Sequence, residues 1–146
     1  MEITIQKASL SQLPAIIQLL KLNNLPFEDL QQQMLDHFLV AKNDQEVVGV
    51  VGLEVYEQVA LLRSLVVSRH FRGMEVGKRL MESVEKVEKS LQLQQVFLLT
   101  TDAERYFKPF GYQVVHRSGV PESIQQTSEF SDLCPASAKV MVKTIP

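Results

Sequence analysis

Residues 59–91 read VALLRSLVVSRHFRGMEVGKRLMESVEKVEKSL, which is an apolar run, a turn with two glycines and then an amphipathic pattern. The apolar run predicts a strand over Val59–Ser68, and apolar residues three or four apart predict a helix from Gly73 to about Leu91. A tight turn that opens a helix leaves backbone N–H groups unpaired, and the helix dipole adds positive potential. We therefore expect a phosphate group to bind at the turn, Arg72-Gly73-Met74-Glu75-Val76-Gly77-Lys78.

Two other phosphate-binding loops are excluded at this turn. A P-loop requires Ser or Thr after its Gly-Lys pair, and here Lys78 is followed by Arg79. A dinucleotide fingerprint requires three glycines at fixed spacing, which the segment lacks. A turn that serves packing alone stays open as the alternative.

The composition predicts one globular domain over residues 1–146. Hydrophobic residues make up 45% of the chain and charged residues 22%, which is typical of a globular protein. A formal net charge of −2 gives no general attraction to nucleic acid or to an anionic membrane. We expect the partners to be small molecules or other proteins.

The N-terminal segment lacks the apolar run of a signal peptide, and the chain lacks an apolar stretch long enough to cross a membrane, so we expect a cytoplasmic protein. The single Cys134 excludes an intrachain disulfide. His37, His70 and His116 have no metal-ligand spacing with it or with each other, so no metal site is predicted.

The rest of the pattern predicts a mixed α/β fold with about seven strands, most of them antiparallel, flanked by helices. The run over residues 96–101 is almost wholly apolar, as in a central strand that lies parallel to its partner across the long helix. The other expected strands are Glu2–Ala8, Phe38–Lys42, Glu46–Tyr56, Tyr112–His116 and Ala138–Lys143. Three further helices are expected. The first has an apolar stripe at Leu13, Ile16, Ile17 and Leu20, the second spans Phe27–His37, and the third runs from a cap at Thr101 or Asp102 to Phe110.

Two motifs and this order of elements resemble the GNAT superfamily of acetyl-CoA-dependent N-acetyltransferases. The turn follows the family pattern of Arg or Gln, two residues, Gly, one residue, then Gly or Ala, with Arg72 and Gly77 in place and Glu75 where the middle glycine is usual. The segment Ala103–Tyr112 resembles the second landmark, a small residue, an aromatic pair and then Gly-aromatic. The resemblance covers the whole chain and implies the GNAT fold, with a splayed central sheet.

The resemblance also implies how acetyl-CoA binds as co-substrate. Main-chain groups of Leu65, Val66 and Val67 would pair with the pantetheine arm, and the N–H groups of the Arg72–Lys78 turn would hold the pyrophosphate. Phe107 stands where the family usually has the tyrosine that protonates the leaving thiolate. Near the position of Leu61, many members of the family have a glutamate that takes the proton of the amine.

Glu54 and Arg63 interrupt apolar strands and are the predicted catalytic pair. Strict alternation places Leu61, Arg63, Leu65 and Val67 on one face, where the acceptor would lie. Arg63 would then bind a carboxylate or arsonate-like oxyanion of the acceptor, while Glu54 holds Arg63 or relays the proton of the amine. A purely structural cross-strand ion pair is the alternative.

A narrower resemblance links the chain to the small N-acetyltransferases of bacterial arsenic-resistance operons. It rests on four segments, which are Gly52–Tyr56, Leu61–Leu65, Leu98–Thr101 and Ser128–Ala138. We expect transfer of acetyl from acetyl-CoA to the primary amine of a small, amino-acid-like acceptor. The alternatives are a non-catalytic acyl-CoA-binding sensor and a protein N-acetyltransferase, and exposed strand edges leave room for a homodimer.

Overall fold

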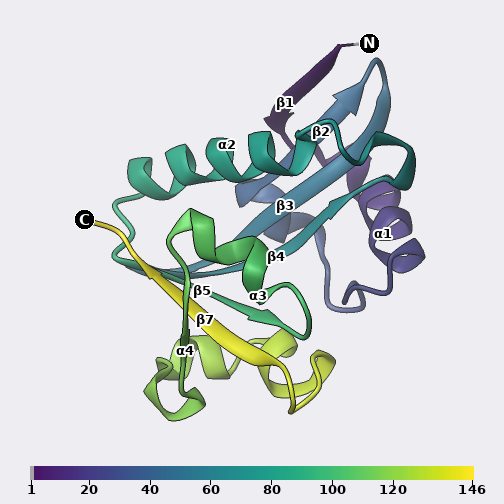
Figure 1. Ribbon diagram of the computed structural model, residues 1–146. Helices are drawn as coiled ribbons and strands as arrows, with labels where there is room; N and C mark the ends of the chain where they lie inside the picture. The colour runs from purple at the N-terminus through teal and green to yellow at the C-terminus, as the bar shows by residue number, and fades with distance from the viewer. Residues whose placement is uncertain (1) are drawn as a thin grey trace.

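A seven-stranded sheet forms the centre of the protein in the computed structural model, which describes residues 2–146 (Figure 1). Met1, the first residue of the predicted domain, lies outside the described residues. The strand order is β1-β2-β3-β4-β5-β7-β6, and β4–β5 is its parallel pair. The strands are β1 (Ile3–Lys7), β2 (Phe38–Asn43), β3 (Glu46–Tyr56), β4 (Val59–Val67), β5 (Gln95–Thr100), β6 (Gln113–Val115) and β7 (Lys139–Thr144).

The three consecutive strands β2, β3 and β4 pair antiparallel through tight turns, as predicted. Asp44 and Glu57 have positive φ values of 54° and 58° in these turns. Such left-handed residues match the twist of the strands that they join. The predicted crossover is also confirmed, because β4 pairs parallel with β5 and the long helix α2 (Val76–Ser90) joins them.

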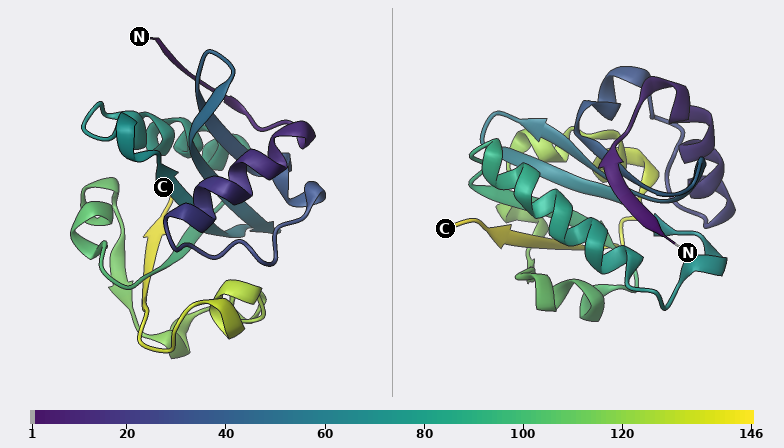
Figure 2. Two further views of the ribbon diagram at one scale, coloured as in Figure 1. Left: turned by 90° about the vertical axis from the view of Figure 1, so that its right-hand side faces the viewer. Right: turned by 90° about the horizontal axis from the view of Figure 1, so that it is seen from above.

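The sheet has helices on both faces (Figures 1 and 2). Val76, Leu80 and Val84 of α2 are buried in one core with the sheet, as the predicted stripe requires. On the other face, α1 (Leu13–Leu22) buries Ile16 and Leu20 completely. A further core forms around Ile124 of α4 (Glu122–Gln125). No helix within residues 2–146 is long and apolar enough to cross a membrane.

Outside the Arg72–Lys78 turn, three details of the predicted elements are wrong. The helix expected over Phe27–His37 is reduced to the 3-10 turn η2 (Gln32–His37), and residues 28–29 form a turn. Before the short helix α3 (Glu104–Phe107), the hydroxyl that accepts a hydrogen bond from the Ala103 N–H, at 2.9 Å, belongs to Thr100 and not to Thr101. The segment 117–137 has no predicted element, yet it contains η5 (Arg117–Gly119), α4 and a π-type turn, η6 (Glu129–Leu133). The remaining 3-10 turns are η1 (Leu10–Gln12), η3 (Arg69–Phe71) and η4 (Lys108–Phe110).

Candidate functional site

A β-bulge at Ser64 shapes the middle of β4. Gly52 pairs with Arg63, but two residues earlier in β3 Val50 pairs with Val66, so β4 has one extra residue at this point. Ser64 takes a positive φ of 64°, which a serine rarely adopts. The bulge changes which side chains of β4 face which side of the sheet.

The prediction that Leu61, Arg63, Leu65 and Val67 share one face is therefore wrong. Leu65 and Val67 pack against the core beneath α2, whereas Leu61 lies in the core around Ile124 on the opposite face. Alternation along a strand inverts at an extra residue. The side chain of Arg63 thus lies on the side of the sheet away from α2.

The parallel strands β4 and β5 separate beyond their first three residue pairs, Val59–Gln95, Ala60–Val96 and Leu61–Phe97. A cleft of about 1610 Å³ opens at this splay and is lined by both strands, the first turns of α2 and the segment around α3. The splayed sheet that the family resemblance implies is confirmed. Among the predicted coenzyme residues, those that line the cleft are Leu65, Val66, Val67, Arg72, Gly73, Glu75, Val76, Gly77, Lys78 and Phe107.

The Arg72–Lys78 turn forms one end of this cleft. Gly73 and Glu75 take left-handed φ values of 77° and 61°, so α2 begins at Val76 and not at Gly73 as predicted. The first N–H groups of a helix have no partner within it, and those of α2 lie at the cleft. The Arg72 guanidinium donates to the Val67 carbonyl at 3.1 Å and ties the turn to the end of β4. Met74, which was also predicted to bind the coenzyme, is exposed outside the cleft lining.

We expect Gly77→Val to weaken acetyl-CoA binding by about tenfold or more, which corresponds to about 1.4 kcal/mol. A Cβ at Gly77 would lie 2.8 Å from the Tyr106 hydroxyl and 3.7 Å from Cγ2 of Val67, so a valine side chain would crowd this end of the cleft. Calorimetry measures the dissociation constant. Gly119→Ala is the matched control, since a Cβ there meets only ordinary contacts. Unchanged affinity in a folded Gly77→Val protein would remove the turn from the binding site.

Glu75→Gly should stabilise the protein by about 1 kcal/mol, because glycine adopts the left-handed conformation without the steric cost of a Cβ. It should also tighten acetyl-CoA binding modestly, since a carboxylate next to an anion is removed. Glu75→Gln separates the two effects, because it removes the charge and keeps the Cβ. A large loss of affinity in Glu75→Gly would show that Glu75 organises the turn for its ligand.

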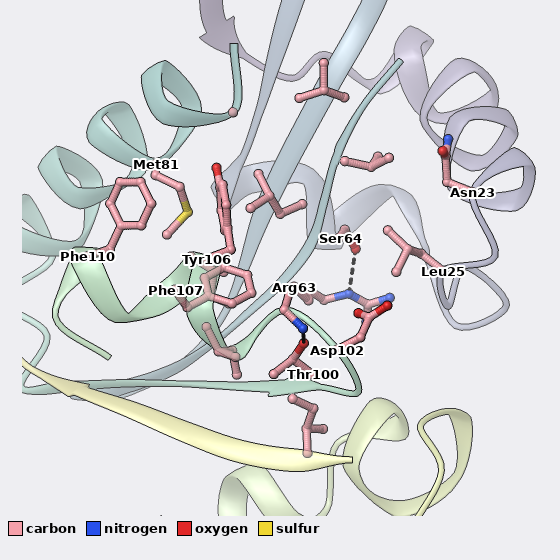
Figure 3. A pocket seen from close by; sticks show the side chains of 18 of the residues that line it. Asn23, Leu25, Arg63, Ser64, Met81, Thr100, Asp102, Tyr106, Phe107 and Phe110 are labelled. Carbon is pink, nitrogen blue, oxygen red and sulfur yellow. Dashed lines mark hydrogen bonds between the residues drawn. The ribbon is translucent and has the colours of Figure 1, made fainter. Parts of the chain in front are cut away.

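Arg63 is the centre of a buried ion cluster. Its guanidinium contacts Asp29 through both carboxylate oxygens, Glu54 at 3.0 Å and Glu129 at 3.2 Å, and its side chain has no exposed surface. Its Nε also donates to the Ser64 hydroxyl at 3.0 Å, as Figure 3 shows. Each N–H of the guanidinium thus points toward an acceptor within the protein, with the Pro26 carbonyl at 3.5 Å as the most distant.

Charge and burial compete in this cluster. Burial by itself lowers the pKa of Arg63, but the hydrogen bond with Asp29 and the charges of Glu129 and Glu54 outweigh it and raise that pKa above its ordinary value. Burial, with smaller effects from Glu54 and Asp29, raises the pKa of Glu129 to about 7, although Arg63 opposes the shift. Burial and the neighbouring Glu54 carboxylate raise the pKa of Tyr56 to about 12.

The structure brings Glu54 and Arg63 together, as expected, and adds two carboxylates that the sequence did not indicate. The sequence pattern places Asp29 within an expected helix, and Glu129 lies in the segment Ser128–Ala138 that carries the narrower resemblance. Neither has a local signal for a role at the site, since Asp29 is 34 residues from Arg63 in the chain. Arg63 and Glu129 line the cleft. Direct binding of an acceptor anion by Arg63 stays a prediction, and such an anion would have to displace a carboxylate.

The aromatic pair lies across the cleft from β4 (Figure 3). Phe107 is buried and makes edge-on contacts with Tyr106 at 5.2 Å and Tyr112 at 5.9 Å between ring centroids. Burial raises the pKa of Tyr106, whose hydroxyl faces the first turn of α2 at Gly77. The hydroxyl therefore lies at the helix end of the cleft, where phosphate is expected.

Comparison with known proteins identifies the same family. Residues 10–112 match the model of the acetyltransferase (GNAT) family. The amino-acid acetyltransferase of Pasteurella multocida is 24% identical over 132 residues, which are 84% of this chain and 30% of that protein. An uncharacterized N-acetyltransferase of Chlorobaculum tepidum is 30% identical over 97 residues, which are 64% of this chain and 62% of that protein. The chain thus spans less than two thirds of both relatives.

Two solved structures have the same fold. A Mycobacterium tuberculosis protein in complex with CoA and NLQ superposes with a TM-score of 0.81 at 22% identity, over 98% of this chain and 99% of that one. The N-acetylglutamate synthase of Neisseria gonorrhoeae, complexed with coenzyme A and N-acetyl-glutamate, has a TM-score of 0.84 at 16% identity, over 100% of this chain and 36% of that one. The family match covers more than half of the chain, and the splayed sheet and helix-opening turn agree with it. The chain belongs to the acetyltransferase (GNAT) family.

Proposed function

We propose that this protein transfers the acetyl group of acetyl-CoA to the primary amine of a small, amino-acid-like acceptor. The observation that carries the proposal is the cleft at the splay of β4 and β5. It has the first turn of α2 at one end and polar side chains of the Arg63 cluster at the other. A thioester lying along β4 would bring its carbonyl toward the acceptor end.

The two ends of the cleft suit the two parts of the coenzyme. The edge of β4 that faces the splay is not paired with β5 beyond Leu61, so main-chain groups of Leu65, Val66 and Val67 can pair with the amides of pantetheine. The unpaired N–H groups that open α2 suit the pyrophosphate. In this proposal the side chains of the turn contribute less than its backbone.

The named relatives favour a small acceptor of the amino-acid class. The Pasteurella protein is named an amino-acid acetyltransferase, and the Neisseria structure contains N-acetyl-glutamate. At this level of identity they support the acceptor class by analogy alone. The likeness to arsenic-resistance N-acetyltransferases stays a prediction, because none of the relatives named above carries that description. A cytoplasmic location, a homodimer and a single domain over 1–146 likewise stay predictions.

Glu54 and Arg63 act in this proposal by positioning the acceptor site. Arg63 fixes the carboxylates of Asp29 and Glu129, and Glu54 is held between Arg63 and the Tyr56 hydroxyl, which donates to it at 2.9 Å. No side chain at position 61 or 107 supplies the usual base or acid, since these are Leu61 and Phe107. A thiol with a pKa of about 8.5 can leave with a proton taken from water or from the amine itself.

Release of CoA thiol during incubation with a panel of amines tests the function. The panel contains free amino acids, their N-blocked forms, polyamines and peptides with a lysine or a free N-terminus. We expect thiol release and an acetylated product with amino acids, and none with N-blocked ones. Binding of acetyl-CoA without turnover would mark a non-catalytic acyl-CoA sensor, and turnover of peptides alone would mark a protein N-acetyltransferase.

A further inference from the structure

Glu129 is a buried carboxylic acid placed beside the bulge of β4. It begins the π-type turn η6 in the connection between β6 and β7, and only 4% of the residue is exposed. It lines the cleft together with Ser64 and Thr100, which stand on the two splayed strands. A residue from the C-terminal part of the chain thus reaches the point where the strands diverge.

The oxygens of the three carboxylates around Arg63 differ in their availability. Both oxygens of Asp29 accept hydrogen bonds from Arg63. The two oxygens of Glu54 accept from Tyr56 and from Arg63. Glu129 contacts Arg63 through Oε2, whereas the nearest partner of its Oε1 is the Cys134 thiol at 4.0 Å. Neither oxygen of Glu129 accepts a hydrogen bond from Arg63, because the Arg63 Nε–H donates to the Ser64 hydroxyl, and Glu129 is the carboxylate of the three that lines the cleft.

We propose that Glu129 removes the proton from the ammonium group of the acceptor. This assignment rests on the proposed function, since it deepens the chemistry of the same cleft. Three carboxylates surround a single guanidinium, so the cluster has a surplus of negative charge that attracts an ammonium group. Arg63 then acts as a positioning residue, because its contact with Oε2 orients the carboxylate.

The acid–base properties of the site agree with this role. The groups that face Glu129 are Arg63 on β4, Glu54 on β3, Asp29 before η2 and Cys134 within its own loop. Burial and the two carboxylates raise the pKa of Glu129 to about 7, against the effect of Arg63. Burial, followed by the charge of Glu129, raises the pKa of the Cys134 thiol to about 12, so this thiol stays protonated. A base is most effective when its pKa is near the working pH.

The acceptor ammonium gives one proton to Glu129, and the free amine attacks the thioester carbonyl carbon. The new C–N bond forms, the C–S bond breaks, and the second proton of the amine nitrogen goes to the departing sulfur, which leaves as CoA thiol. Glu129 then releases its proton to solvent. The net reaction consumes an ammonium and acetyl-CoA and yields an amide, CoA thiol and one proton.

The test compares wild-type protein with Glu129→Gln, which keeps the shape of the side chain and removes its charge. We expect kcat to fall by about 100-fold, with the acetyl-CoA dissociation constant unchanged. The wild-type pH profile of kcat should lose activity below about pH 7, and this acidic limb should be absent in the variant. Asp132→Asn, which removes an exposed carboxylate from the same turn, is the matched control and should behave as wild type.

Glu129→Asp and a direct titration keep the outcome unambiguous. Glu129→Asp retains a carboxylate one methylene further away and should recover part of the lost kcat and the acidic limb. Carboxyl-labelled glutamate followed by carbon NMR, with the Glu129 signal assigned by its loss in Glu129→Gln, should show titration near pH 7. Near-normal kcat with an unchanged acidic limb in Glu129→Gln, or titration near pH 4.5, would overturn the assignment. Titration near pH 7 without turnover of any amine by wild-type protein would overturn the proposed function instead.

Discussion

Arg63→Leu should lower the free energy of unfolding by about 3–5 kcal/mol, because it leaves buried carboxylates without their counter-ion. The side chains of Glu54 and Glu129 are 10% and 6% exposed, so water can solvate neither of them well. Urea denaturation measures the loss. A buried ion pair adds little net stability when both partners are replaced together, and the large effect arises only when one partner is removed.

Glu129→Gln/Arg63→Leu is the matching double variant and should regain much of the lost stability. It removes the cation together with the most buried of the three carboxylates. The acceptor kinetics of Arg63→Leu, measured below its unfolding transition, separate the two roles of the arginine. A sharply raised acceptor KM with little loss of stability would show that Arg63 binds an anionic group of the acceptor directly. A strong loss of stability that the double variant reverses would show that it organises the carboxylates.

The sheet and its crossover could be predicted because they depend on local patterns. Apolar runs bounded by Asn43-Asp44 and Glu57-Gln58 mark the hairpins, and the stripe of α2 identifies a helix on one face of the sheet. The turn at Arg72–Lys78 could also be predicted, since Gly77 and the position of the turn before a helix are features of the sequence. These patterns act over a few residues, and the fold preserves them.

The geometry of the acceptor site could not be predicted, because it depends on interactions between distant residues. The bulge at Ser64 has no glycine to mark it, and it inverted the predicted face of Leu65 and Val67. Asp29 lies in a segment whose helical pattern gave way to turns, and there it forms an ion pair with Arg63. Tertiary contacts commonly override weak helix propensity. Glu88 of α2 is likewise fully buried against Lys143 of β7, a contact between residues 55 positions apart that no local pattern indicates.

Raising the pH should destabilise the wild-type protein relative to Glu129→Gln. The pKa of Glu129 is raised from an ordinary value of 4.5 to about 7, so the fold favours the neutral acid. The stability that this group contributes is fully present below about pH 4.5 and is lost as the pH rises through about 7. The difference between these pKa values corresponds to about 3 kcal/mol when the titration is complete.

Urea denaturation of both proteins at pH 5 and pH 8 measures this effect. Between pH 5 and pH 8, the free energy of unfolding of wild type should fall relative to that of Glu129→Gln by most of the approximately 3 kcal/mol, because glutamine has no proton to lose. Asp132→Asn, at an exposed position of the same turn, should differ from wild type in free energy of unfolding by the same amount at both pH values. An equal difference for Glu129→Gln at pH 5 and pH 8 would mean that Arg63 already holds Glu129 ionised across this range. The carboxylate would then be a fixed counter-ion of the guanidinium, too weak a base to accept a proton from an ammonium group near neutral pH.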